Sequence, residues 1–357
     1  MPDSSHVMSL RQVQNSKYLR KSDYPLILFH KMGIFDVLRM SMPNVLTVLN
    51  YHRIDNPYNT GFDTFRPNIS ATPEMFATQM DYLIRNYNVI SGSELVSFIK
   101  HQKKLPANAA IITFDDGYLD NYTNAYPILK ARNLPAIIFL AADYIETNKP
   151  FYWDWIAKCF HQTRKDAADL PNFGLHTWQD QPTRDRVMLG WIETLKKLPE
   201  LEKQTMLKRL PEILDVSVLN SAFNGLMISW AQAREMSDHG IEMGGHTASH
   251  PILTRIALDE VTTELSKSKK RIEDKVGKPV LSFAYPNGQS TDFNDEIVER
   301  VSKAGYDAAF TLLSGPTRYK TVLDQPYTIR RIFLSHADNF SRFVAKLTGV
   351  PRIISRW

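Results

Sequence analysis

Short apolar runs recur along the chain, and most are followed by a stretch whose apolar residues have helical spacing. Val261, Leu265 and Ile272 mark one such stretch, which ends at Gly277. Repeated strand–helix units imply parallel strands with right-handed crossovers. About seven units without a Gly-rich dinucleotide fingerprint favour a β/α barrel over an open sheet. The expected strands are residues 45–50, 88–90, 109–114, 136–141, 240–245, 280–285, 307–313 and 328–334.

This rhythm breaks between about residues 143 and 227, which are rich in Trp, Lys, Gln and Leu. Helical spacing over residues 195–214 predicts that the segment is a mostly helical insertion in a main domain of residues 45–357. Its aromatic cluster, residues 151–155, suits either sugar stacking or a small core of the insertion. We expect the core, because Trp and Phe are mostly buried.

Residues 1–44 precede the regular pattern and form a predicted N-terminal extension. Within it, Leu26, Phe29, Ile34 and Leu38 roughly share one helical face. That face suits docking on a membrane surface or packing on the main domain, and we expect the packing. The basic residues nearby are Arg11, Arg20, Lys21, Lys31 and Arg39.

The charge is mildly basic, at +5 over 357 residues, and the basic residues are scattered with a local excess at the ends. We therefore expect no nucleic-acid partner, whereas an anionic membrane or an acidic glycan stays open. The single cysteine, Cys159, excludes an intrachain disulfide. Residues 1–21 carry no apolar signal core, and no run reaches the ~20 apolar residues of a membrane span. We expect a cytoplasmic protein with peripheral contact to the inner membrane face.

Two adjacent carboxylates, Asp115 and Asp116, follow the apolar run 109–114, and Gly117 lets the chain turn away. Paired acids at a strand end are costly unless they share a positive charge. A metal ion meets that need, with one carboxylate as ligand and the other as proton acceptor from a bound water. The alternative is a solvated Asp-Asp-Gly turn. The motif alone does not decide between them.

A histidine pair follows another strand. His246 and His250 are four residues apart, which in a helix or turn brings both rings to one face. With Asp116 they offer two nitrogens and one oxygen, as in catalytic zinc sites with open positions. The alternative is two unrelated histidines near a turn. Because barrel chemistry lies where strands end, this pair, the acid pair and the turn at 285–288 indicate one metal site, with Zn²⁺ favoured and Co²⁺, Ni²⁺ or Mn²⁺ as substitutes.

These motifs resemble the NodB-type polysaccharide deacetylase superfamily, the family 4 carbohydrate esterases. The resemblance rests on TFDDG at 113–117 and HTASH at 246–250, with FAYPNG at 283–288 in the place of the third motif. YHR at 51–53 resembles the first strand of many exopolysaccharide-type members. The match covers roughly residues 45–335 without the insertion.

The resemblance implies a distorted (β/α) barrel with metal-dependent N-deacetylase activity. It implies that Asp115 is the general base and that Asp116, His246 and His250 bind the metal. Backbone N–H groups would stabilise the oxyanion. The implied substrate and oxyanion residues are Tyr118, Tyr285, Pro286 and Asn287.

The third motif departs from the common Arg-Pro-Pro-Tyr form of the family. Ala284 stands at the arginine position and Asn287 at the tyrosine position. An arginine that orients the base must therefore come from elsewhere. Arg331 is our candidate, with Arg330 second, because both lie on a late strand; the alternative is that they are surface cations.

The general acid of the family is a histidine in a Leu-x-His motif. Leu334-Ser335-His336 fits these letters in the final part of the chain, and Asp338 is a candidate partner for His336. The alternative is that this match is accidental, because a three-residue motif often occurs by chance. His52, at the end of the first strand, either lines the pocket or is a buried structural histidine.

The expected function is removal of an N-acetyl group from an amino sugar in a glycan, a lipid-linked saccharide or a nucleotide-sugar-derived precursor. One alternative is a deformylase or another amide hydrolase on the same site, because fold and metal do not fix the acyl group. A second is a catalytically weak glycan-binding component of a polysaccharide assembly system. Asp115→Asn would leave the function of such a component intact.

Overall fold

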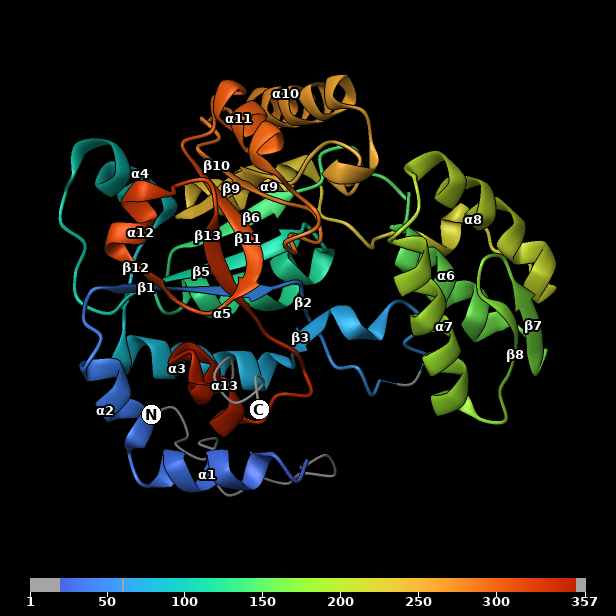
Figure 1. Ribbon diagram of the computed structural model, residues 1–357, viewed down its shortest axis with the longest axis horizontal. Helices are drawn as coiled ribbons and strands as arrows, with labels where there is room; N and C mark the ends of the chain where they lie inside the picture. Colours follow the sequence, from blue (N-terminus) through green and yellow to red (C-terminus); the bar gives the residue numbers. More distant parts are fainter. Residues whose placement is uncertain (1–19, 60, 351–357) are drawn as a thin grey trace, which may run out of the picture.

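The computed structural model describes residues 20–59 and 61–350. Its centre is a closed barrel of parallel strands, in which β1 pairs with both β5 and β13 and so joins the two ends of the sheet. The predicted β/α barrel of about seven strands is thereby confirmed (Figure 1). Around the ring the strands are β1 (Val45–Tyr51), β5 (Ala109–Asp116), β6 (Ala136–Leu140), β9 (Ile241–Gly245), β10 (Ser282–Ala284), β11 (Ala308–Ser314) and β13 (Ile329–Phe333).

The apolar runs of the sequence form strands because both faces of the barrel wall are covered. Every residue of β5 and β6 is buried, as expected for parallel strands between a packed interior and a layer of helices. The run at 88–90 forms the short β4 (Asn88–Val89), which extends the sheet beside β5 but lies outside the ring. The other short strands are β2 (Arg53–Ile54), β3 (Ile69–Ala71) and β12 (Thr317–Arg318).

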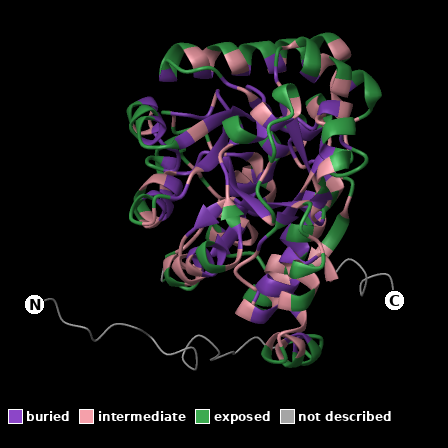
Figure 2. Ribbon diagram, turned by 90° about the vertical axis from the view of Figure 1, so that its left-hand side faces the viewer, coloured by how far each residue is buried: buried purple, intermediate pink, exposed green. Residues whose placement is uncertain are grey.

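Helices surround the barrel and present their apolar faces to it (Figure 2). On α10, Val261, Leu265 and Ile272 are buried, and Gly277 ends the helix with a φ of 79°. Thr72 accepts a hydrogen bond from the backbone of Met75 and so caps α3. The barrel helices are α3 (Pro73–Asn86), α4 (Gly92–His101), α5 (Tyr126–Lys130), α9 (Trp230–Asp238), α10 (Leu258–Val276), α11 (Asp295–Lys303) and α12 (Tyr319–Asp324).

The segment between β6 and α9 stands beside the barrel (Figure 1). It contains α6 (Tyr152–Gln162), α7 (Gln181–Leu195) and α8 (Glu200–Leu214). The helical stretch predicted over residues 195–214 begins later than expected. Leu195 is the last residue of α7, residues 196–199 connect the two helices, and α8 begins after Pro199. An antiparallel hairpin, β7 (Ala167–Leu170) and β8 (Gly174–Thr177), was not predicted.

Two short helices, α1 (Asp23–Lys31) and α2 (Ile34–Met40), precede the barrel. Helix α1 packs beside α13 (Phe340–Leu347) and α2 packs beside α1, with Leu26 and Phe35 buried. The first 19 residues of the predicted extension, including Arg11, and residues 351–357 lie outside the described part. Within the described ranges, no helix is long and apolar enough to cross a membrane.

Candidate metal centre

A cavity of about 370 Å³ opens where the barrel strands end. The barrel supplies one side of it, and α6 and α7 of the insertion supply the other. Its wall combines acidic, imidazole, amide and aromatic groups, which is the composition of a reactive site and not of a structural void. The wall includes His52, Asp115, Trp153, His246, His250 and Asn287.

The three predicted ligands converge beside this cavity. The Oδ1 atom of Asp116 lies 3.7 Å from Nε2 of His246 and 3.5 Å from Nε2 of His250. The two Nε2 atoms are 3.1 Å apart. Ligands about 2.0–2.1 Å from a tetrahedral Zn²⁺ stand about 3.3 Å from one another, so this triangle has the size of one face of such a site.

The protonation chemistry of the three groups also suits a cation. Both carboxylate oxygens of Asp116 are buried and have no hydrogen-bond partner among the described residues. Burial, followed by the neighbouring charge of Asp115, raises the pKa of Asp116 well above its ordinary value. Burial lowers the pKa of His246 and of His250, so both rings are held neutral. A buried carboxylate without a partner next to two neutral imidazoles fits a divalent metal.

Hydrogen bonds and packing fix both ligand rings. The Nδ1 atom of His246 lies 2.7 Å from the carbonyl of Ala284, which selects the tautomer that leaves Nε2 bare. The ring of His250 meets Phe151 and Trp153 edge-on, at centroid distances of 5.3 and 5.0 Å. These two aromatic residues come from the insertion, so the insertion helps to hold a barrel ligand in place.

The backbone around the ligands is unusual. Asp116, Thr247, His250 and Asn287 have φ values of 77°, 63°, 61° and 60°, in the left-handed region. Residues other than Gly, Asn and Asp rarely adopt this conformation. The turn between the histidines is held by Thr247, whose Oγ1 accepts a hydrogen bond from the backbone of His250 at 2.9 Å. Residues in such strained backbone conformations are found most often at functional sites.

Arg331 holds Asp115 with both arms of its guanidinium. Nη1 donates to Oδ1 at 2.6 Å and Nη2 to Oδ2 at 2.8 Å, and Asn50 adds a third hydrogen bond at 2.9 Å. Burial is the largest single influence and would raise the pKa of Asp115, but the charges of Arg331, His246 and His52 and the hydrogen bond from Arg331 together outweigh burial and hold that pKa below its ordinary value. Arg331 is fully buried, whereas Arg330 is only partly buried. Of the two predicted arginines, Arg331 is the one placed to orient Asp115.

The histidine that lies near Asp115 is His52, whereas the predicted candidate His336 lies elsewhere. Nε2 of His52 lies 3.9 Å from Oδ2 of Asp115. His336 is absent from the cavity wall, and its Nδ1 lies 3.0 Å from the carbonyl of Ile69. Asp338 pairs with Lys346 and not with His336. The physical reason is the closure of the barrel, which sets the end of β1 beside the end of β5.

Of the four residues expected at the substrate, Asn287 lines the cavity, whereas Tyr118, Tyr285 and Pro286 are buried away from it. The side-chain amide of Asn287 donates to Asp292 at 2.6 Å. The Tyr285 hydroxyl donates to the carbonyl of Tyr327 at 3.1 Å. Asn287 therefore remains a candidate for substrate contact, and the two tyrosines serve the packing.

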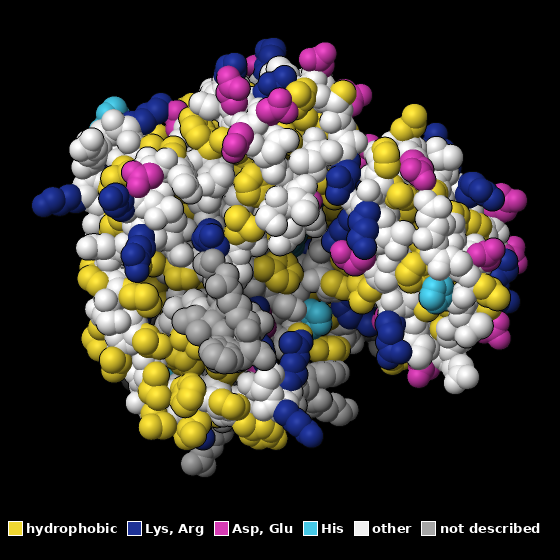
Figure 3. All heavy atoms as spheres, in the orientation of Figure 1, with side chains coloured by type: hydrophobic (Ala, Val, Ile, Leu, Met, Phe, Trp, Pro, Cys, Tyr) yellow, Lys and Arg dark blue, Asp and Glu magenta, His cyan; other side chains and the backbone are white. Residues whose placement is uncertain are grey.

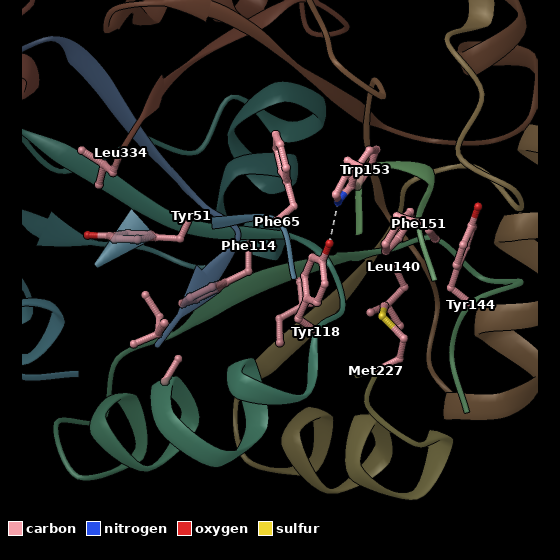
Figure 4. Packing of buried hydrophobic residues seen from close by; sticks show 14 of the residues in the cluster. Tyr51, Phe65, Phe114, Tyr118, Leu140, Tyr144, Phe151, Trp153, Met227 and Leu334 are labelled. Carbon is pink, nitrogen blue, oxygen red and sulfur yellow. Dashed lines mark hydrogen bonds between the residues drawn. The ribbon is translucent and has the colours of Figure 1, made fainter. Parts of the chain in front are cut away.

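Tyr118 joins the barrel to the insertion. Its hydroxyl donates to Oδ2 of Asp154 and accepts from the indole of Trp153, both at 2.7 Å. Figure 4 shows the hydrogen bond between Tyr118 and Trp153. Asp154 also accepts a hydrogen bond from the backbone of Phe65 at 3.0 Å. The network places Trp153 between Tyr118 and the ring of His250. The aromatic cluster is therefore largely buried, as expected, yet Trp153 also forms part of the cavity wall.

Two further hollows lie along the boundary between the barrel and the insertion. The second hollow, of about 740 Å³, shares Tyr152 and His250 with the cavity and is also lined by Tyr144 and Trp155. The third, of about 870 Å³, shares Ser249 and the start of α8 with the second. The three hollows are therefore neighbours, and the ligand His250 lines the first two.

Comparison with known proteins identifies relatives of this chain. The model of the polysaccharide deacetylase family matches residues 102–309. The chain is 24% identical over 309 residues to the poly-β-1,6-N-acetyl-D-glucosamine N-deacetylase of Escherichia coli (strain K12), covering 86% of this chain and 39% of that protein. It is 21% identical over 314 residues to YxkH of Bacillus subtilis (strain 168), covering 88% and 80%. The chain thus spans about two fifths of the first relative and most of the second.

Solved structures share the fold. The Streptococcus pyogenes deacetylase PplD, in complex with acetate, superposes with a TM-score of 0.57 at 18% identity, covering 86% of this chain and 99% of that one. IcaB from Ammonifex degensii superposes with a TM-score of 0.56 at 19% identity, covering 86% and 98%. At these identities the likeness concerns the fold alone.

Proposed function

Because the chain belongs to the polysaccharide deacetylase family, we propose that it is a metal-dependent hydrolase that removes the N-acetyl group from an amino sugar of a glycan. The observation that carries this proposal is the triangle of Asp116, His246 and His250 next to the buried pair of Asp115 and Arg331. A ligand set and an ionised, oriented carboxylate side by side are the two parts that amide hydrolysis by water requires.

Asp116, His246 and His250 would hold the metal, with Zn²⁺ favoured by the ligand types. A divalent ion bound there would polarise the amide carbonyl and make a water molecule more acidic. Asp115 accepts a proton from the attacking water, because Arg331 keeps this carboxylate ionised and fixes both its oxygens. We assign an oxyanion contact to the backbone N–H of Asn287, whose residue lines the cavity.

His52 delivers a proton to the leaving amine. Burial lowers the pKa of His52 to about 4, so its ring is neutral at neutral pH before the reaction. The proton that it gives must therefore arrive during the reaction, and Asp115, 3.9 Å away, is the neighbour that has just received one from water. The carbon–nitrogen bond of the amide breaks, the sugar nitrogen gains this proton, and acetate leaves.

The substrate is more than one sugar long in this proposal. Two hollows lie beside the cavity, and the nearer one is lined by Tyr144, Tyr152 and Trp155. Aromatic faces suit the CH faces of pyranose rings. The Escherichia coli relative is named for N-deacetylation of poly-β-1,6-N-acetyl-D-glucosamine, which makes an oligomer of that sugar the first substrate to test.

The decisive experiment measures acetate release from N-acetylglucosamine oligomers of different linkage and from lipid-linked N-acetylated sugars, with and without a chelator. We expect release that stops with the chelator and returns with Zn²⁺. Asp115→Asn should abolish release while zinc still binds, and His250→Ala should weaken zinc binding itself. Absence of chelator-sensitive release from every substrate would overturn the proposal.

N-formylated oligomers in the same assay separate deacetylation from deformylation, since faster formate release would identify the alternative hydrolase. An Asp115→Asn protein that still supports glycan assembly in cells would instead favour the binding component.

A further inference from the structure

The outer face of α1 and α2 carries a group of exposed apolar side chains, here called the outer patch. On α1 and just after it, Tyr24, Leu28 and Met32 follow one another every four residues and are 62%, 55% and 65% exposed. On α2, Val37 and Met40 are 63% and 60% exposed. Residues with these spacings share a helix face. Figure 3 shows hydrophobic side chains gathered over this part of the molecule, at the lower left.

The exposed hydrophobic side chains are concentrated at the outer patch and are not spread evenly along the chain. Five of the thirteen large hydrophobic side chains that are exposed in the described part of the chain fall within residues 24–40. Single exposed apolar residues are normal on a protein surface, whereas a contiguous group marks an interaction surface.

The patch is not needed to hold the helices on the barrel, because their opposite face does this. Leu26 and Phe35 are buried there. The buried carboxylate of Asp23 accepts hydrogen bonds from Arg342 of α13, and Nδ1 of His30 lies 3.0 Å from the hydroxyl of Ser341. The inner face of the two helices therefore fixes them to the molecule, and their solvent-facing side is also apolar because it carries the outer patch.

The charges beside the patch are positive. Arg20, Lys21 and Lys31 are exposed, and none of them forms an ion pair with a carboxylate of the described residues. The acids of the same segment are already paired, Asp23 with Arg342 and Asp36 with Arg39. The surface that meets this patch must accept apolar side chains and carry negative charge.

We propose that the outer patch docks on the surface of an anionic lipid bilayer. Leu28, Met32 and the tyrosine ring would enter the boundary between head groups and acyl chains, with the flanking cations at the lipid phosphates. A second copy of the chain is a poorer occupant, because a two-fold interface over the patch would set the same three cations against themselves. This surface is separate from the metal centre, so the proposal does not depend on the proposed reaction.

The test is flotation of the full chain with vesicles of phosphatidylcholine alone or of phosphatidylcholine mixed with phosphatidylglycerol. We expect binding to the anionic vesicles that weakens with added salt. Leu28→Glu with Met32→Glu should weaken binding more than about tenfold. Lys21→Gln with Lys31→Gln should weaken it by about fivefold for each cation removed.

The matched control is Leu201→Glu, because Leu201 is 82% exposed but lies on α8 of the insertion. It should bind vesicles like the unchanged protein, and circular dichroism should show that all variants are folded. Equal binding to neutral vesicles, no binding at all, or an equal loss in the control would overturn the proposal. A concentration-dependent dimer that Leu28→Glu abolishes, without vesicle binding, would assign the patch to a second copy instead.

Discussion

Arg331 reaches across the interior of the barrel from β13 and pairs with Asp115 at the end of β5. Neither residue is exposed to solvent, and the surrounding protein solvates a charge poorly. Each of the two side chains therefore neutralises the charge of the other. Because the pair lowers the pKa of Asp115, it stabilises the fold above the unfolded-state pKa of about 3.9. This contribution disappears as the pH falls through the lower folded-state pKa.

Arg331→Met should therefore destabilise the protein at neutral pH by about 3–5 kcal/mol, because it leaves a buried carboxylate without its partner. The pKa of Asp115 should then rise, so the variant should lose less stability than the unchanged protein on acidification. Urea unfolding at several pH values measures both effects. Arg330→Met, on the partly exposed neighbour, should have a much smaller effect, and equal losses would contradict the assigned role of Arg331.

His52→Ala and His336→Ala separate the two candidate proton donors. Removal of His52 should lower kcat by about 10²–10⁴-fold, the usual contribution of a general acid, with little change in zinc affinity. His336→Ala should cost less than about tenfold, since His336 does not line the cavity. Steady-state deacetylation kinetics decide between them, and a larger loss for His336→Ala would return the role to that residue.

Asp116 makes metal binding sensitive to pH. Its raised pKa means that this carboxylate keeps its proton to a higher pH than an ordinary aspartate, and a metal that binds below that pKa must displace the proton. Zinc affinity should therefore rise with pH until Asp116 is fully ionised. Calorimetric titration in two buffers with different ionisation heats should show proton release. Identical heats of zinc binding in both buffers would contradict the raised pKa of Asp116.

At the scale of elements, the insertion acts on the barrel through Tyr118. Tyr118→Phe removes the hydroxyl that bridges Trp153 and Asp154 and leaves both polar groups buried without this partner. We expect a loss of about 1–3 kcal/mol in the free energy of unfolding. Zinc affinity should also fall, because Trp153 packs against His250.

Tyr122→Phe is the control for this change. It also removes one hydroxyl hydrogen bond, to Glu235 at 2.7 Å, but near the surface. Denaturant melts and zinc titrations of the two variants give the comparison. A Tyr118→Phe protein as stable as Tyr122→Phe would show that the bridge does not hold the insertion in place.

The sequence predicts those parts of the fold that are determined by residues close to one another in the chain. The buried strands follow from apolar runs, and the converging Asp116, His246 and His250 follow from strand ends and a four-residue spacing. The hairpin β7–β8 was missed because half of its residues are exposed and carry no clear alternation. The choice between His52 and His336 depends on the pairing of β1 with β5, which no local pattern shows.

At the scale of the whole molecule, the first barrel strand fills the gap between the last strand and β5. Helix α1 packs on α13, so the two ends of the described chain lie on the same side. The connection before β5 is exposed at Gln102, Lys103 and Lys104. Neither this connection nor the junction between the ends contributes to the cavity wall.

A circular permutant should therefore fold. We expect a chain opened between Gln102 and Lys103, with residues 20 and 350 joined by a flexible linker, to retain its circular dichroism, its zinc binding and most of its activity. Opening the chain inside β5 is the matched control and should give insoluble protein, because every residue of that strand is buried. Failure of the first permutant to fold would show that residues 20–102 must precede β5 in the chain.

The left-handed backbone at Thr247 and His250 has a consequence for laboratory evolution. Each of these conformations costs of order 1–3 kcal/mol for a residue with a side chain other than Asn or Asp, and glycine would adopt them freely. A screen that rewards heat resistance alone would therefore enrich glycine at these positions and remove the ligand His250 together with the strain. The most heat-resistant descendants of this protein would be barrels that no longer hold a metal, unless each round of selection also demanded turnover.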